Sequence, residues 1–304
     1  MSGNLRACLR PERARGGQTV HVNDAGCSWD PSLYAGSAAY YAQGRVPYTQ
    51  ELVDRLVAEL TLNGSGRLLD VGCGPGSLTL LLAPLLEHAI GLDADPHMLE
   101  EAERQAAAAG ITNVAWVNLR AEDMPADLGP FRVAALAQSF HWMNRPLVAR
   151  LLHRALDADG VLVHLHATTH QGIDSDVPLP QPRPPRREID DLVKRFLGTR
   201  HRAGQGTLPE VSISEADRGR YEAEIYRAAG FNRPTRIEIP GPVVVRSADD
   251  IVASVFSLSS AAPHLFGDRG PIFEAELREL LAAVSPGGRF SEQMRETAID
   301  LWHV

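Results

Sequence analysis

The chain has 304 residues, and its 44% hydrophobic content is typical of a globular protein with a substantial buried core. Its formal net charge of −8 at pH 7 argues against a nucleic-acid partner, because phosphate binding needs a dense basic surface. The three cysteines, Cys8, Cys27 and Cys73, form neither a disulfide framework nor a CxxC zinc pair, and no run of about 18 apolar residues predicts a membrane span.

The first part of the chain, residues 1–34, has no hydrophobic periodicity and is rich in glycine and arginine. We expect it to form a mobile tail. It lacks the apolar stretch of a secretory signal, so the expected location is the cytoplasm. Residues 35–304 are expected to form one domain.

From residue 49 onward, helical and strand patterns alternate. Apolar residues spaced as on one helix face predict a helix at 49–60, and short apolar runs that end in turn residues predict strands. This alternation predicts βαβ units and hence an α/β fold, with a Rossmann-like, doubly wound, mostly parallel sheet of seven strands. The predicted strands are 67–71, 88–93, 114–118, 131–137, 161–167, 235–239 and 296–302, and the helices between the first five are 77–86, 96–109 and 145–156.

After residue 167 the regular alternation stops. Five prolines lie within residues 178–185, which must therefore be extended, and we interpret this stretch as a linker. The later helices predict a cap over the open end of the sheet, with residues 168–220 and 241–290 as candidate lid insertions. These helices are predicted at 187–197, 215–229, 249–257 and 272–284.

A glycine-rich turn, DVGCGPG at residues 70–76, joins the first predicted strand to a helix. Such a turn lets the backbone approach a nucleotide near the free N–H groups of a helix, but dinucleotide enzymes use it too. Here the glycines are spaced one residue closer than in GxGxxG, and Asp70 lies two residues before the first of them. The turn resembles the first motif of class I S-adenosylmethionine-dependent methyltransferases, in particular their small-molecule, type 11-like subgroup.

The resemblance covers residues 40–167 and implies roles for several residues. Asp93, at the end of the second predicted strand, would hold the ribose hydroxyls, since one carboxylate can accept from both. Glu122 would meet the adenine amine, because Arg120 stands where many relatives have an acid, and Met98 is interpreted either as an adenine contact or as a core residue. The implied cofactor residues are Tyr41, Arg45, Asp70, Gly72, Cys73, Gly74, Gly76, Asp93, Ala94, Met98, Ala121, Glu122 and Gln138.

Upstream of the core, Tyr41 and Arg45 belong to a segment that looks like the Y-x-x-x-R-x-x-Y segment of small-molecule methyltransferases. In that family the segment folds over the cofactor, with the tyrosine near the sulfonium and the arginine near the carboxylate. An aromatic face beside a sulfonium has the physics of a cation–π contact. A core role for the tyrosines is the alternative.

The residues after the fourth predicted strand are expected to face the substrate, because ligands lie at the carboxyl ends of parallel strands. Phe140, His141 and Trp142 are the candidate substrate contacts. The N/D-P-P-Y/F tetrapeptide of enzymes that methylate amino groups of nucleobases or glutamine is absent. His141 is the candidate general base, with a structural role as the alternative, and His170 is a second candidate.

A metal site is not expected. His164 and His166 share one face of a predicted strand, but that strand should be buried and no carboxylate lies within residues 164–170. We therefore interpret these histidines as hydrogen-bonded core residues rather than ligands.

The expected function is methyl transfer from S-adenosylmethionine to a small metabolite, with S-adenosylhomocysteine as the product. An oxygen acceptor is placed ahead of nitrogen or carbon, in bacterial secondary metabolism. The alternatives are a related protein that catalyses a rearrangement or cyclisation or only binds its ligand, a nicotinamide dehydrogenase, and a methyltransferase for macromolecules. A small molecule is the expected partner, and homodimer formation is left open.

Overall fold

The structure is a computed structural model that describes residues 30–199 and 219–304, except for 126 and 233. The tail predicted for residues 1–34 lies almost entirely outside the described residues, although Leu33 is described and buried. Beyond these ranges, the structure gives only the backbone of the first residues of one helix and of β1 (Glu12–Arg13), β2 (Thr19–Val20), β8 (His201–Ala203) and β9 (Gly206–Leu208).

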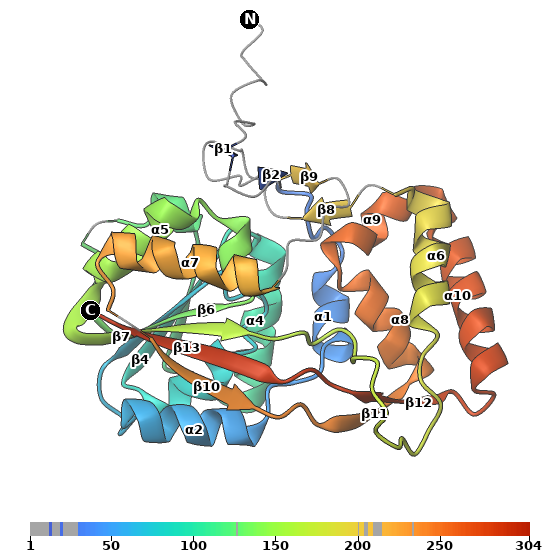
Figure 1. The fold of residues 1–304 in the computed structure, drawn as a ribbon, viewed down its shortest axis with the longest axis horizontal. Coiled ribbons are helices and arrows are strands. Elements are labelled where there is room, and N and C mark those ends of the chain that lie inside the picture. The colour runs from blue at the N-terminus through green and yellow to red at the C-terminus, as the bar shows by residue number, and fades with distance from the viewer. Residues whose placement is uncertain are drawn as a thin grey trace, which may run out of the picture.

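Seven strands form one sheet, in which β13 runs antiparallel to both of its neighbours and the strands from β7 to β5 pair in parallel (Figure 1). This confirms the predicted α/β, Rossmann-like, mostly parallel sheet. The chain order reverses between β3 and β6, and in such sheets ligands bind outside the carboxyl ends of the strands at that point. In spatial order the strands are β10 (Thr235–Ile239), β13 (Thr297–His303), β7 (Leu156–His166), β6 (Phe131–Ala137), β3 (Arg67–Val71), β4 (His88–Asp93) and β5 (Val114–Asn118).

Helices cover both faces of the sheet because each buries one apolar side. On one face, Leu152 and Tyr226 belong to the same buried cluster as Leu136, and on the other face Leu56 packs with Leu82. No described helix is both long and apolar enough to cross a membrane. The first face carries α5 (Arg145–Ala155) and α7 (Glu215–Ala229), the second carries α2 (Gln50–Leu60) and α3 (Thr79–Leu82), and α4 (Pro96–Ala109) packs on β4 and β5.

A helical cap lies beyond the strand ends (Figure 1). It has a hydrophobic core of its own, in which Phe256, Phe266 and Phe273 are buried. Residues from both predicted lid regions build the cap. The helix predicted at 215–229 does not belong to it, because that helix packs on the sheet as α7. The cap consists of α1 (Ala38–Gly44), α6 (Arg186–Leu197), α8 (Ala248–Phe256), α9 (Pro263–Phe266), α10 (Gly270–Val284) and the antiparallel pair β11 (Val243–Ser247) and β12 (Arg289–Gln293).

Two predicted elements differ from the observed ones by more than two residues at one end. The helix predicted at 77–86 is only the four residues of α3, followed by a 3₁₀ turn at Ala83–Leu85, because Pro84 has no N–H to continue an α-helix. The strand predicted at 161–167 begins five residues earlier, at Leu156. Asp159 and Gly160, a pair typical of turns, lie within this extended strand. The sequence pattern did not predict β11 and β12.

The α2 face supplies a test of this packing. Leu56 is fully buried between α2 and the sheet, so Leu56→Ala should lower the free energy of unfolding by about 2–5 kcal/mol in urea denaturation. Glu59→Ala, on the exposed side of the same helix, should change it by no more than about 0.5 kcal/mol. Equal effects of the two substitutions would contradict the packing.

Candidate functional site

A cavity of about 410 Å³ opens at the carboxyl ends of β3, β4 and β6, where the chain order reverses. This volume lies within the range of small-molecule sites, about 300–1,000 Å³. The turn after β3, the end of β4, the loop after β6 and the segment between α1 and α2 form its walls. The sequence-predicted residues that line it are Tyr41, Arg45, Gly72, Cys73, Gly74, Asp93, Ala94, Met98, Ala121, Glu122, Gln138 and Trp142.

The glycine turn needs glycine for two different reasons. At Gly72, with φ +67°, an added Cβ would lie 2.5 Å from the Cβ of Ser139, so the turn could not approach the loop after β6. At Gly74, with φ +54°, an added Cβ would meet nothing within 4 Å, because this residue faces the cavity. The turn therefore presents bare backbone to a ligand.

Asp70 and Gly76 do not line the cavity among the described residues. Asp70 is buried beneath the turn, where its Oδ2 accepts a 2.6 Å hydrogen bond from Thr79 Oγ1 and ties the end of β3 to α3. Burial, opposed by that hydrogen bond, raises the pKa of Asp70 to about 7. Its role is to hold the turn rather than to contact a ligand.

Asp93 stands at the cavity wall at the end of β4. Its Oδ2 accepts from the N–H of Gly74 at 2.7 Å, and its Oδ1 accepts from the N–H of Asp95 at 2.9 Å. Burial raises the pKa of Asp93 to about 6, and these two hydrogen bonds limit the rise. Asp95 has another task, since its side chain caps α4 by accepting from the N–H of His97.

Aromatic side chains form another part of the cavity wall. The Arg45 guanidinium lies 4.6 Å from the Tyr41 ring centre and donates to Ser257 of the cap. The ring of Tyr34 meets that of Trp142 edge-on, with centres 5.7 Å apart. Tyr34 belongs to the stretch predicted to be a tail, and no periodic signal in the sequence indicated its place here.

Part of the cavity wall is apolar. Met98 and Ala121 are buried and line it. Glu122 is held on both sides, since its Oε1 accepts from the backbone N–H of Asn144 at 2.7 Å and its Oε2 lies 3.3 Å from Nη2 of Arg120. Arg120, the departure from the family pattern, is therefore the ion-pair partner of the acid predicted to meet the adenine.

Gln138 connects the loop after β6 to the segment upstream of α2. Its φ is +57°, and it is one of two described non-glycine residues with a positive φ, a conformation that residues other than glycine rarely adopt. Its Nε2 donates to Oη of Tyr48 at 2.9 Å, and both residues line the cavity. Tyr48 is the last tyrosine of the Y-x-x-x-R-x-x-Y segment, so that motif was the available signal for it.

The other predicted substrate residues lie elsewhere. Phe140 is buried and stacks on Tyr226, and His141 is exposed and lines a second cleft of about 260 Å³. His170 is not among the described lining residues of either cleft, and burial together with Arg45 and other arginines lowers its pKa to about 3. Neither candidate base faces the 410 Å³ cavity.

The residues present fit S-adenosylmethionine, the cofactor that the family resemblance implies. Asp93 offers carboxylate oxygens for two hydroxyls, and the bare backbone at Gly74 leaves room for close approach. Met98 and Ala121 supply an apolar wall for a purine, and Tyr41 supplies an aromatic face for a cationic sulfur.

Comparison with known proteins points the same way. Residues 68–160 match the methyltransferase domain family. The chain is 29% identical over 126 residues to an uncharacterized methyltransferase of Schizosaccharomyces pombe, covering 40% of this chain and 47% of that protein. It is 34% identical over 80 residues to an uncharacterized RNA methyltransferase of Bacillus cereus, covering 26% of this chain and 18% of that protein. The matches therefore span less than half the length of either relative.

Among solved structures, the chain is similar to a putative methyltransferase of Bacillus halodurans. The TM-score is 0.48 at 16% sequence identity, and the match covers 83% of this chain and 97% of the other.

The buried carboxyl beneath the turn makes a pH-dependent contribution to stability. Because the pKa of Asp70 is raised from 3.8 to about 7, the folded protein retains a proton that the unfolded chain has released between these pH values. The stabilisation that protonated Asp70 gives the folded protein is therefore complete below about pH 4, and it is lost as the pH rises through about 7. Asp70→Asn removes the titration, so the difference in free energy of unfolding between wild type and variant should fall by on the order of 4 kcal/mol over this range. Parallel pH profiles in urea denaturation would contradict the assignment.

Proposed function

The chain belongs to the class I S-adenosylmethionine-dependent methyltransferases of the type 11-like group, and we propose that it transfers the methyl group of S-adenosylmethionine to a small metabolite. The observation that carries this proposal is the convergence of the glycine turn, Asp93 and an aromatic wall on one cavity. S-adenosylhomocysteine would be the second product.

The cavity residues would bind and orient the two reactants. When bound, S-adenosylmethionine supplies an activated methyl group on a sulfonium. Asp93 would accept from the ribose hydroxyls, while the apolar wall at Met98 would fix the purine. Tyr41 and Trp142 would exclude water from the far end, where the acceptor must be aligned with the sulfur for in-line displacement.

A small acceptor fits the enclosure of this cavity. The cap holds the aromatic wall in place through Arg45, which donates to both Oγ and the carbonyl of Ser257. The net charge of −8 and the lack of an N/D-P-P-Y/F tetrapeptide also favour a small molecule over a nucleic acid. We place this acceptor in bacterial secondary metabolism.

The titratable groups of the cavity favour an oxygen acceptor that ionises without a base from the protein. No histidine is among the described lining residues. Burial raises the pKa of Tyr34 and of Tyr48, so these phenols stay protonated and serve as hydrogen-bond partners. A carboxylate or an acidic phenolate would need no proton removed, which places oxygen ahead of nitrogen or carbon.

The position of His141 leads to a prediction about turnover. Because its side chain lines the second cleft, His141→Ala should leave kcat at saturating acceptor within about threefold of wild type from pH 6 to 9. Loss of a general base would instead lower kcat by about 100-fold or more. A fall of that size, abolished at high pH, would restore His141 as the base.

The two acidic residues after β4 should separate cofactor affinity from stability. Asp93→Ala should weaken binding of S-adenosylhomocysteine by about 100-fold in calorimetry, because two charge-assisted hydrogen bonds are lost. Asp95→Ala should keep the affinity within about threefold and lower the free energy of unfolding by about 1 kcal/mol, because α4 loses its cap. Equal losses of affinity would refute the ribose assignment.

The function itself is tested with methyl-tritiated S-adenosylmethionine and a panel of phenols and carboxylic acids. Transfer of tritium to one of these acceptors is the expected result. Binding of the cofactor without transfer to any acceptor would favour the alternative of a rearrangement, a cyclisation or ligand binding alone. Thermal stabilisation by NAD but not by S-adenosylmethionine would indicate a dehydrogenase, and transfer to RNA would overturn the small acceptor.

A further inference from the structure

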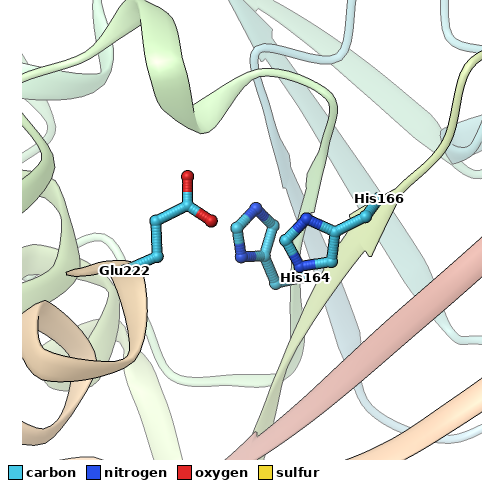
Figure 2. Close-up of side chains that lie close together, drawn as sticks. All are labelled: His164, His166 and Glu222. Carbon is cyan, nitrogen blue, oxygen red and sulfur yellow. The ribbon is translucent and has the colours of Figure 1, made fainter. Parts of the chain in front are cut away.

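The second cleft, of about 260 Å³, holds a group of side chains that methyl transfer does not use. His164, His166 and Glu222 each offer one ligand atom, and these three atoms lie within 4.8 Å of one another. Figure 2 shows Glu222 reaching from α7 toward two imidazoles that lie beside each other at the end of β7. From these residues we propose a binding site for a divalent transition-metal ion, with zinc as the occupant.

The composition of the group selects the metal. Two imidazole nitrogens and one carboxylate oxygen suit zinc and its neighbours, whereas magnesium and calcium prefer oxygen ligands alone. Ligands of a tetrahedral zinc ion lie about 3.4 Å apart, so side-chain rotation would have to close the present spacing, which is within 4.8 Å, by up to about 1.4 Å. Three protein ligands leave a coordination position that would open into the cleft.

Each imidazole is also oriented as metal-bound histidines are. In such sites one ring nitrogen binds the metal while the other donates to a neighbouring acceptor. Nδ1 of His164 lies 3.1 Å from Oη of Tyr226, and Nε2 of His166 lies 3.1 Å from Oδ2 of Asp300. With protons on those nitrogens, the lone pairs of His164 Nε2 and His166 Nδ1 are left for an ion.

The position of Glu222 on its helix supports this assignment. It lies one turn before Tyr226 on the side of α7 that packs on the sheet, and it is 5% exposed. Burying a carboxylate there costs free energy unless a charge compensates it. Its Oε1 lies 3.9 Å from Nη1 of Arg145, and a divalent ion bound to the carboxylate would add a further positive charge.

The metal site would border the cofactor cavity. Gln138 and Ser139 line both clefts, and Phe140 meets the ring of His164 edge-on at 5.5 Å. An ion at this place would therefore stabilise the loop after β6 from the side away from the cofactor.

The test uses the whole 304-residue chain, stripped with a chelator and titrated with Co²⁺ as a spectroscopic probe. A saturable visible absorption band at one ion per chain, displaced by Zn²⁺, is expected. His166→Ala and Glu222→Gln should each lower the affinity for Co²⁺ by about 100-fold or more. Asp300→Asn should lower it by about 10–100-fold. Far-UV circular dichroism reports whether each variant folds. If Glu222→Gln does not fold, His166→Ala still decides the test, because His166 is only half-buried and its replacement should be tolerated.

Matched controls use exposed residues of the same types. His97→Ala on α4 and Glu224→Gln on α7 should leave the affinity within about twofold. No saturable band, or equal affinities in wild type and in folded His166→Ala, would overturn the proposal. Since no cofactor or activity enters the measurement, its result is independent of the proposed methyl transfer.

Discussion

The site depends on one close approach, between the glycine turn and the loop after β6. Ser139 Oγ donates to the carbonyl of Val71 at 2.6 Å, and only a residue without Cβ at position 72 leaves space for it. This contact places the ends of β3 and β6 side by side at the reversal of chain order. The cavity then opens beyond the turn, and Asp93 reaches across to the N–H of Gly74. At the glycine turn, the cavity wall is thus bare backbone at the end of a sheet strand.

The cap attaches to this rigid part through a few buried arginines. Arg246 is 5% exposed and donates to the carbonyls of Gly44 and His170, while Glu292 balances its charge at 3.3 Å. Buried charges are tolerated when they are paired in this way. Because Gly44 precedes Arg45, the same network holds the aromatic wall of the cavity. Under the proposed function, the cap would therefore shape the acceptor end of the cavity, and the sheet would shape the cofactor end.

The loop that follows β6 separates two different chemical environments. On one side, tyrosines and apolar residues surround the cavity, and burial raises the pKa of Asp93 in its wall. On the other side, two imidazoles and a buried carboxylate gather in a polar cleft.

The sequence by itself determined the alternation of strands and helices, the glycine turn and Asp93, because each depends on a pattern within a few residues. The strands predicted at 67–71 and 88–93 agree with the structure to the residue. Only the tertiary structure decided that His141 faces away from the cofactor cavity, that Tyr34 packs on Trp142, and that Glu222 lies beside two histidines of β7. These contacts join residues 56 to 108 positions apart in the chain, and they arise from how helices and the cap pack on the sheet, for which no local pattern exists.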